Sequence, residues 1–169
     1  MILSLDPSLS CIGWAVMPLD AGRVIEYGTY KPKGDAMDRK LIDAYRWLCW
    51  LFDDSYHNKG EAFTTFAFEV PVVYRNPATT IKLAQLVGVL RVAAHKWVEE
   101  TVEINPGGRL AALGLPVNLK RAVAKERVIA HVNERYGLAL KAKNDNEADA
   151  IAVGIAASRK LKLAQMVAE

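Results

Sequence analysis

The 169-residue sequence predicts an α/β fold in which helices flank a five-stranded mixed sheet. Two observations support this prediction. The first three strand-like segments follow one another through short connections, which is typical of an antiparallel meander. The later strand-like segments alternate with helical ones, as they do where helices connect parallel strands. This length matches one domain, so we expect residues 1–169 to form a single domain.

Short runs of apolar and β-branched residues, each bounded by turn-forming residues, predict the five strands. The first run ends at Asp6 and Pro7, and residues 18–22 mark the turn after the second. The fourth run is rich in Phe, Val and Thr, and Pro71 limits the pairing possible near its end. The predicted strands span residues 2–5, 12–17, 24–30, 64–73 and 102–104.

Apolar residues at helical spacing predict the helices. Leu41, Tyr45, Leu48 and Phe52 give the first helix one apolar face. Gly137 is a natural C-terminal stop for the third helix. The predicted helices span residues 36–56, 77–98, 119–136 and 146–163.

The helix predicted over residues 77–98 is apolar on two faces. Asn76 is its expected N-cap, and Pro77 occupies the first helical position. Ile81, Ala84 and Gly88 line the second of its apolar faces. Such a helix is either sandwiched between layers or contacts a partner chain.

The composition is that of an ordinary soluble globular protein, with 51% hydrophobic and 24% charged residues. No run of 18 apolar residues occurs, so we expect no membrane span. The first strand-like run begins at Ile2, and nothing that could serve as a secretory signal precedes it. The two cysteines suggest neither a disulfide framework nor a metal knuckle. We therefore expect a cytoplasmic setting, in a bacterium or in the host of a virus.

Positive charge is concentrated in the second half of the chain. Residues 1–70 carry 7 basic and 10 acidic residues, whereas residues 71–169 carry 15 and 9. The stretch 109–143 alone has 8 basic and 2 acidic residues. Such a segment suits a polyanionic partner, although a solvated basic face would have the same composition.

Three acidic residues interrupt runs that are otherwise apolar or small: Asp6, Glu69 and Asp149. A buried carboxylate needs a compensating positive charge, and no Arg or Lys is adjacent in these runs. A divalent cation shared by the three would supply that charge. Oxygen ligands without His or Cys indicate Mg²⁺ or Mn²⁺ and not zinc. For any single acid, a helix cap, a strand end facing water or a structural ion pair is the alternative.

Three blocks of sequence resemble the RuvC-type Holliday junction resolvases of the RNase H-like superfamily. In the first, residues 2–16, Asp6-Pro7 ends one strand and a turn leads to Gly-Trp in the next. The second contains Glu69 and continues through Arg-Asn-Pro into the helical residues 81–88. The third is residues 147–153 around Asp149. The blocks occur in family order and spacing and cover nearly the whole chain, which implies an RNase H-like fold.

The resemblance implies a metal-dependent endonuclease that cleaves four-way or related branched DNA, leaving 5′-phosphate and 3′-hydroxyl ends. It implies two Mg²⁺ ions, replaceable by Mn²⁺, held by the catalytic residues Asp6, Glu69 and Asp149. Asn146 stands where the family usually has an acid and sometimes a His, and Asp145 precedes it. Both lie on the helix face of Asp149, so the fourth metal ligand is either Asn146 or Asp145. A second departure from the family is Ser8, where Gly is common.

Basic, polar and aromatic residues near these blocks are expected to bind the DNA. Lys125 resembles a family position that contacts DNA beside the active site, and Tyr74 occupies a place where the family often has a stacking aromatic. The predicted DNA-binding residues are Tyr74, Arg75, Asn76, Thr79, Thr80, Lys82, Gln85, Arg109, Lys120, Arg121, Lys125 and Arg127. A two-fold symmetric junction calls for a homodimer, and the helix over 77–98 is the candidate interface.

Two other functions are compatible with parts of the sequence. A non-catalytic protein that binds branched DNA would explain Asn146 as a mark of lost activity, and it would not nick a junction in the presence of metal. An ATPase of the sugar or acetate kinase type shares the superfold and also opens with Asp and a turn. That second alternative is disfavoured because such proteins need two domains and Gly-rich phosphate loops, which this sequence lacks.

Overall fold

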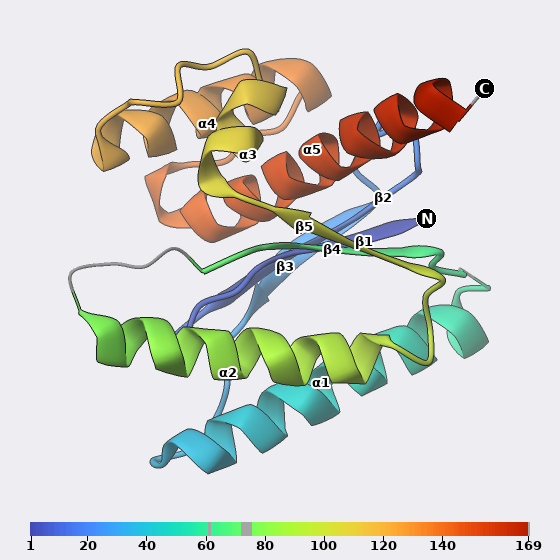
Figure 1. Ribbon diagram of the computed structural model, residues 1–169, viewed down its shortest axis with the longest axis vertical. Helices are drawn as coiled ribbons and strands as arrows, with labels where there is room; N and C mark the ends of the chain where they lie inside the picture. The colour runs from blue at the N-terminus through green and yellow to red at the C-terminus, as the bar shows by residue number, and fades with distance from the viewer. Residues whose placement is uncertain (61, 72–75, 169) are drawn as a thin grey trace.

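A computed structural model describes residues 1–60, 62–71 and 76–168 and confirms the predicted fold class (Figure 1). Its five-stranded sheet has the order β3-β2-β1-β4-β5. Strands β1, β2 and β3 pair antiparallel, whereas β4 is parallel to β1 and β5 is parallel to β4. The strands are β1 (Ile2–Asp6), β2 (Ile12–Met17), β3 (Glu26–Tyr30), β4 (Thr65–Glu69) and β5 (Glu100–Ile104).

Helices cover both faces of this sheet. Figure 1 shows α1 and α2 on one face and α3, α4 and α5 on the other. The helices are α1 (Met37–Asn58), α2 (Pro77–Ala94), α3 (Pro106–Ala112), α4 (Arg121–Tyr136), the 3₁₀ turn η1 (Ala142–Asn144) and α5 (Asp145–Ala168). Within the described residues, no helix is long and apolar enough to cross a membrane.

Helix α3 is absent from the sequence-based prediction, because Asn105-Pro106 was interpreted only as the end of a strand. In the structure the same pair starts a helix. The Asn105 side-chain oxygen accepts a hydrogen bond from the Gly108 N–H at 2.5 Å, and Pro106 occupies the first turn. The fourth strand was also predicted too long: β4 ends at Glu69, before Pro71. The predicted strand residues 72 and 73 lie outside the described part of the chain.

The buried face of α1 differs from the predicted one. Trp47, Leu48 and Phe52 are buried there, but Tyr45 is 40% exposed, so its predicted place in the apolar face is wrong. The Trp47 ring stacks on Tyr30 of β3, with centroids 4.4 Å apart and planes 5° apart. Tyr45 lies two positions before Trp47, on nearly the opposite side of the helix, and therefore faces outward.

A hydrogen-bonded carboxylate joins α1 to the end of β3. Asp43 accepts one hydrogen bond from the Tyr30 hydroxyl at 2.6 Å and another from the Lys33 backbone N–H at 2.7 Å. These two bonds hold the pKa of Asp43 below its ordinary value of 3.8, and the bond from Lys33 has the larger effect. Asp43 is therefore a stabilising contact that depends on its ionised form.

Helix α5 packs closely against the centre of the sheet. A Cβ on Gly154 would lie 2.6 Å from the Met17 sulfur and 2.9 Å from the Ser4 hydroxyl. Any other residue there would displace the Met17 and Ser4 side chains. Ile151 of the same helix is fully buried. The close packing fixes the start of α5 relative to the strand ends.

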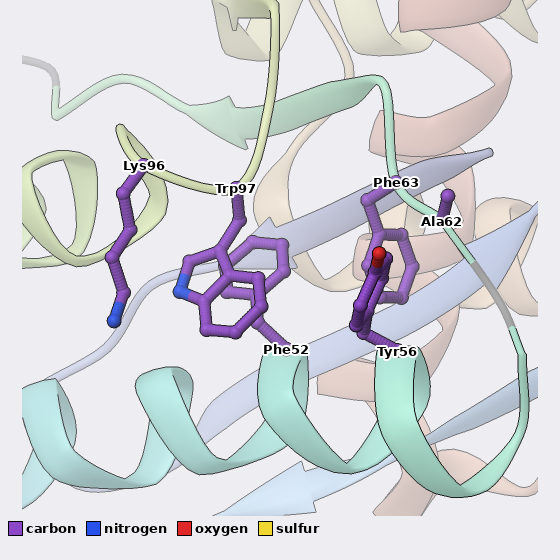
Figure 2. A pocket seen from close by; sticks show the side chains of 6 residues that line it. All are labelled: Phe52, Tyr56, Ala62, Phe63, Lys96 and Trp97. Atoms are coloured by element: carbon purple, nitrogen blue, oxygen red, sulfur yellow. The ribbon is translucent and has the colours of Figure 1, made fainter.

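An aromatic pocket of about 290 Å³ lies between the end of α1 and the segments that lead into β4 and β5 (Figure 2). Phe52, Tyr56 and Phe63 line it, with Trp97 stacked on Phe52 at a centroid distance of 5.9 Å. Phe63 and Trp97 precede the parallel strands, so this pocket is at the opposite end of the sheet from Asp6 and Glu69.

Candidate active site

The carboxyl ends of two neighbouring parallel strands place the first two acids side by side. Asp6 is the last residue of β1, and Glu69 is the last residue of β4. Leu5 and Phe68, the residues before them, are partners in the parallel register. Asp149 comes from the second turn of α5, which packs against β1 and β2. Three acids far apart in the sequence therefore meet at one edge of the fold.

The close packing of α5 on β2 has a specific cause at Gly13. Gly13 pairs with Asp6 across the antiparallel β1 and β2 ladder. A Cβ on Gly13 would lie 2.0 Å from the backbone oxygen of Asn146, so any other residue would push the first turn of α5 away. The glycine of the Gly-Trp block thus sets the distance between Asp6 and the helix that carries Asn146 and Asp149.

These residues line a cleft of about 930 Å³. Its walls include Asp6, Glu69, Asn146 and Asp149. Burial raises the pKa of Asp6 well above its ordinary value, and the charges of Asp149 and Glu69 raise it further. Burial also raises the pKa of Glu69, while Arg109 opposes the shift. The site thus concentrates negative charge where water screens it poorly.

Arg109 of α3 compensates part of this charge. Its Nε lies 3.0 Å from Glu69 Oε2, and its Nη1 lies 2.5 Å from Asp149 Oδ1. Only 9% of the residue is exposed. Burial lowers the pKa of Arg109, but Asp149 and Glu69 outweigh that effect and raise it. Arg109, which was predicted to bind DNA, therefore lies inside the carboxylate cluster.

The donor set fits a hard divalent cation, although Arg109 bridges two of its members. Within the described residues, no group of three or more His, Cys, Asp or Glu side chains is already arranged as a metal site. Glu69 Oε2 is buried and lies 3.0 Å from Arg109 Nε, so a divalent cation bound there would take the place of that contact. Carboxylate and amide oxygens are the ligands that Mg²⁺ and Mn²⁺ prefer.

The two candidates for the fourth ligand have different surroundings. Lys125 donates a hydrogen bond from Nζ to Asp145 Oδ2. Burial raises the pKa of Asp145, but Lys125 and the Asn146 backbone N–H outweigh it and hold the pKa below its ordinary value. Asn146 is among the residues found to line the cleft, and Asp145 is not. The arrangement favours Asn146 as the ligand and Asp145 as the partner of Lys125.

The predicted DNA-binding residues divide into three groups. Besides Arg109, those that line the cleft are Asn76, Thr79, Thr80, Arg121 and Lys125. Those that are exposed outside the cleft are Lys82, Gln85, Lys120 and Arg127. Tyr74 and Arg75 lie outside the described residues. Asn76 also caps α2, because its side-chain oxygen accepts a hydrogen bond from the Ala78 N–H at 3.1 Å, as predicted.

Two roles at the site were missed by sequence reasoning. Arg109 was predicted to bind DNA. Its position beside Glu69 depends on α3, and that helix was not predicted. Gly13 was part of the quoted Gly-Trp block, but its contact with Asn146 joins residues 133 positions apart. A signal for the position of Arg109 was available in Asn105-Pro106, which is a typical helix start directly after a strand.

Comparison with known proteins agrees with the fold. A family model described as crossover junction endodeoxyribonuclease RuvC matches residues 2–157. A protein of that name from Campylobacter jejuni is 27% identical over 164 residues, covering 96% of each chain. One from Sphingopyxis alaskensis is 28% identical over 163 residues, covering 92% of this chain and 94% of the relative.

Solved structures show the same architecture. T. thermophilus RuvC in complex with a Holliday junction substrate superposes with a TM-score of 0.76 at 18% identity, covering 96% of this chain and 94% of that one. A second Thermus thermophilus RuvC structure gives a TM-score of 0.73 at 17% identity. At these identities the structures establish the fold alone. The match of the family model over nearly the whole length shows that this chain belongs to the RuvC family of crossover junction endodeoxyribonucleases.

Proposed function

We propose that this chain, as a RuvC-family endonuclease that resolves Holliday junctions, cuts DNA in the cleft that contains Asp6, Glu69 and Asp149. The observation that supports this proposal most strongly is the convergence of three carboxylates from β1, β4 and α5. Their burial and mutual repulsion are unfavourable for stability, which is typical of residues retained for chemistry.

The family depends on divalent metal ions, and we propose two Mg²⁺ ions at this site, replaceable by Mn²⁺. Asp6, Glu69, Asp149 and Asn146 would hold them. Bound ions of this kind supply an activated water and stabilise the leaving 3′ oxygen, so the product carries a 5′-phosphate. Asp6 is the candidate for a shared ligand, because it ends β1, the central strand of the sheet.

The walls of the cleft suit a phosphate backbone beside the acids. Arg121 begins α4, where free backbone N–H groups add to the attraction for anions. Lys125 lies one turn further on and also lines the cleft. The Thermus protein in the similar structure is bound to a Holliday junction, and we propose branched DNA as the partner here as well. The same family membership makes the cytoplasm the proposed location.

We further propose a homodimer formed through the exposed face of α2. Ile81 is 60% exposed and Val92 is 69% exposed, and both lie on one stripe of the helix with Ala84 and Gly88. A Cβ on Gly88 would meet no atom within 4 Å, so a second helix could approach closely there. Val92→Glu should shift the protein from dimer to monomer in sedimentation experiments, whereas a wild-type monomer would contradict the proposal.

The function is tested by incubating the protein with labelled four-way, forked, flapped and linear DNA plus Mg²⁺ or Mn²⁺. We expect nicks in the four-way junction. Asp6→Asn, Glu69→Gln and Asp149→Asn should each abolish cleavage but retain junction binding. Glu99→Gln, at the exposed opposite end of the sheet, is the matched control and should cleave normally. Junction binding without cleavage by the wild-type protein would favour the non-catalytic alternative.

A further inference from the structure

Arg109 reaches the acids because of how β5 leads into α3. Ile104, the last residue of β5, is the register partner of Glu69. Asn105 follows at once and starts α3, where the Arg109 backbone N–H donates to the Asn105 carbonyl oxygen at 2.9 Å. The first turn of α3 therefore begins beside the end of β4, and Arg109 lines the cleft.

The guanidinium occupies the position of a counter-ion for the cluster. It touches Glu69 at 3.0 Å and Asp149 at 2.5 Å, and it also acts electrostatically on Asp6. A planar guanidinium can span two carboxylates, whereas a lysine ammonium is a point charge. Without a positive charge, these buried carboxylates would repel one another and destabilise the fold.

The two closest contacts of the guanidinium go to different acids. Nε lies beside Glu69 and Nη1 lies beside Asp149. A bidentate arginine and carboxylate pair would instead align two parallel N–H bonds. The arrangement therefore offsets the charges of both acids with one residue.

We propose that Arg109 is an internal counter-ion of the metal-free protein, which a divalent cation must displace from Glu69 and Asp149 in order to bind. This inference rests on the proposed metal site. It adds that the affinity for metal is set partly by competition within the chain. The same arginine stabilises the metal-free fold, so one residue links folding stability to metal binding.

The test is calorimetric titration of the DNA-free protein with MgCl₂ and, separately, MnCl₂. Arg109→Gln removes the competing charge, so the dissociation constant should fall roughly tenfold, the change that each 1.4 kcal/mol produces. Arg109→Lys keeps a charge but cannot span both acids, so its dissociation constant for metal should lie between those of the wild type and Arg109→Gln. Arg121→Gln is the matched control: Arg121 lowers the pKa of Glu69 through its charge, and its removal should change metal affinity less.

Thermal unfolding supplies a second readout. Without metal, Arg109→Gln should melt below the wild type, and saturating MgCl₂ should raise its melting temperature by more than it raises that of the wild type. Suppose that the wild type binds metal and Asp149→Asn does not. Unchanged or weaker metal binding by both Arg109 variants would then overturn the counter-ion inference but leave the proposed metal site intact. If the wild type binds neither metal, the proposed metal site fails together with the inference.

Discussion

Replacement of Gly13 by alanine should separate the two halves of the active site. The added Cβ would lie 2.0 Å from the Asn146 carbonyl oxygen, and an ordinary contact begins at 3.4 Å. The obstacle is backbone, which cannot rotate aside as a side chain would. The first turn of α5 must therefore move by about 1.4 Å, the difference between these distances, or β2 must yield by a similar amount.

The expected cost has a stability part and a catalytic part. Overpacking of this kind costs about 1–3 kcal/mol of unfolding free energy. The displaced turn carries Asn146 and precedes Asp149, so both move away from Asp6. A shift of about 1 Å in a catalytic group can reduce the rate on the order of 100-fold. We therefore expect a large loss of cleavage even at temperatures where the variant is folded.

Urea unfolding and junction cleavage, measured on the same preparation, separate these two parts. Gly154→Ala is the comparator, since its Cβ would meet the flexible end of Met17 and the Ser4 hydroxyl. That variant should lose stability but retain more cleavage per folded molecule than Gly13→Ala. If folded Gly13→Ala cleaves junctions at the wild-type rate, the reasoning from the Gly13 and Asn146 contact is wrong.

Three further predictions concern the fourth ligand, a structural carboxylate and the DNA surface. Asn146→Asp should lower the Mg²⁺ concentration needed for half-maximal cleavage, and Asp145→Asn should reduce cleavage less than Asp149→Asn; the reverse ranking would make Asp145 the ligand. The pKa of Asp43 is held below 3.8, so the stabilisation that Asp43 provides is complete above pH 3.8 and is lost as the pH falls through the folded pKa. Asp43→Asn should therefore lower the free energy of unfolding in urea by about 1 kcal/mol at neutral pH. The difference between this variant and the wild type should shrink in acid. Junction affinity should fall steeply with salt, and Lys125→Ala should reduce the salt slope by roughly one per lost phosphate contact, whereas a flat wild-type salt dependence would exclude this face as the DNA platform.

Local patterns in the sequence were sufficient to predict the sheet and most of the helices. The three-strand meander and the later alternation of strands and helices follow from runs of apolar residues with turn residues between them. One error arose where tertiary packing overrides the local pattern. Tyr45 has the spacing of a buried residue in α1, but stacking of Trp47 on Tyr30 decides which face turns inward. Such a contact joins distant segments and leaves no local signal.

The carboxylates themselves were identifiable because an acid inside an apolar run is unfavourable unless something compensates it. The compensating positive charge could not be identified from the same apolar runs. No Arg or Lys is adjacent to the acids within each run, which predicted a metal, whereas the structure supplies Arg109 from α3. The two solutions do not exclude each other. A cluster that binds divalent ions still has to fold before it meets them, and during that stage its repulsion must be offset by a charge that belongs to the chain. Arg109 meets this requirement, because it contacts both Glu69 and Asp149 from within the fold.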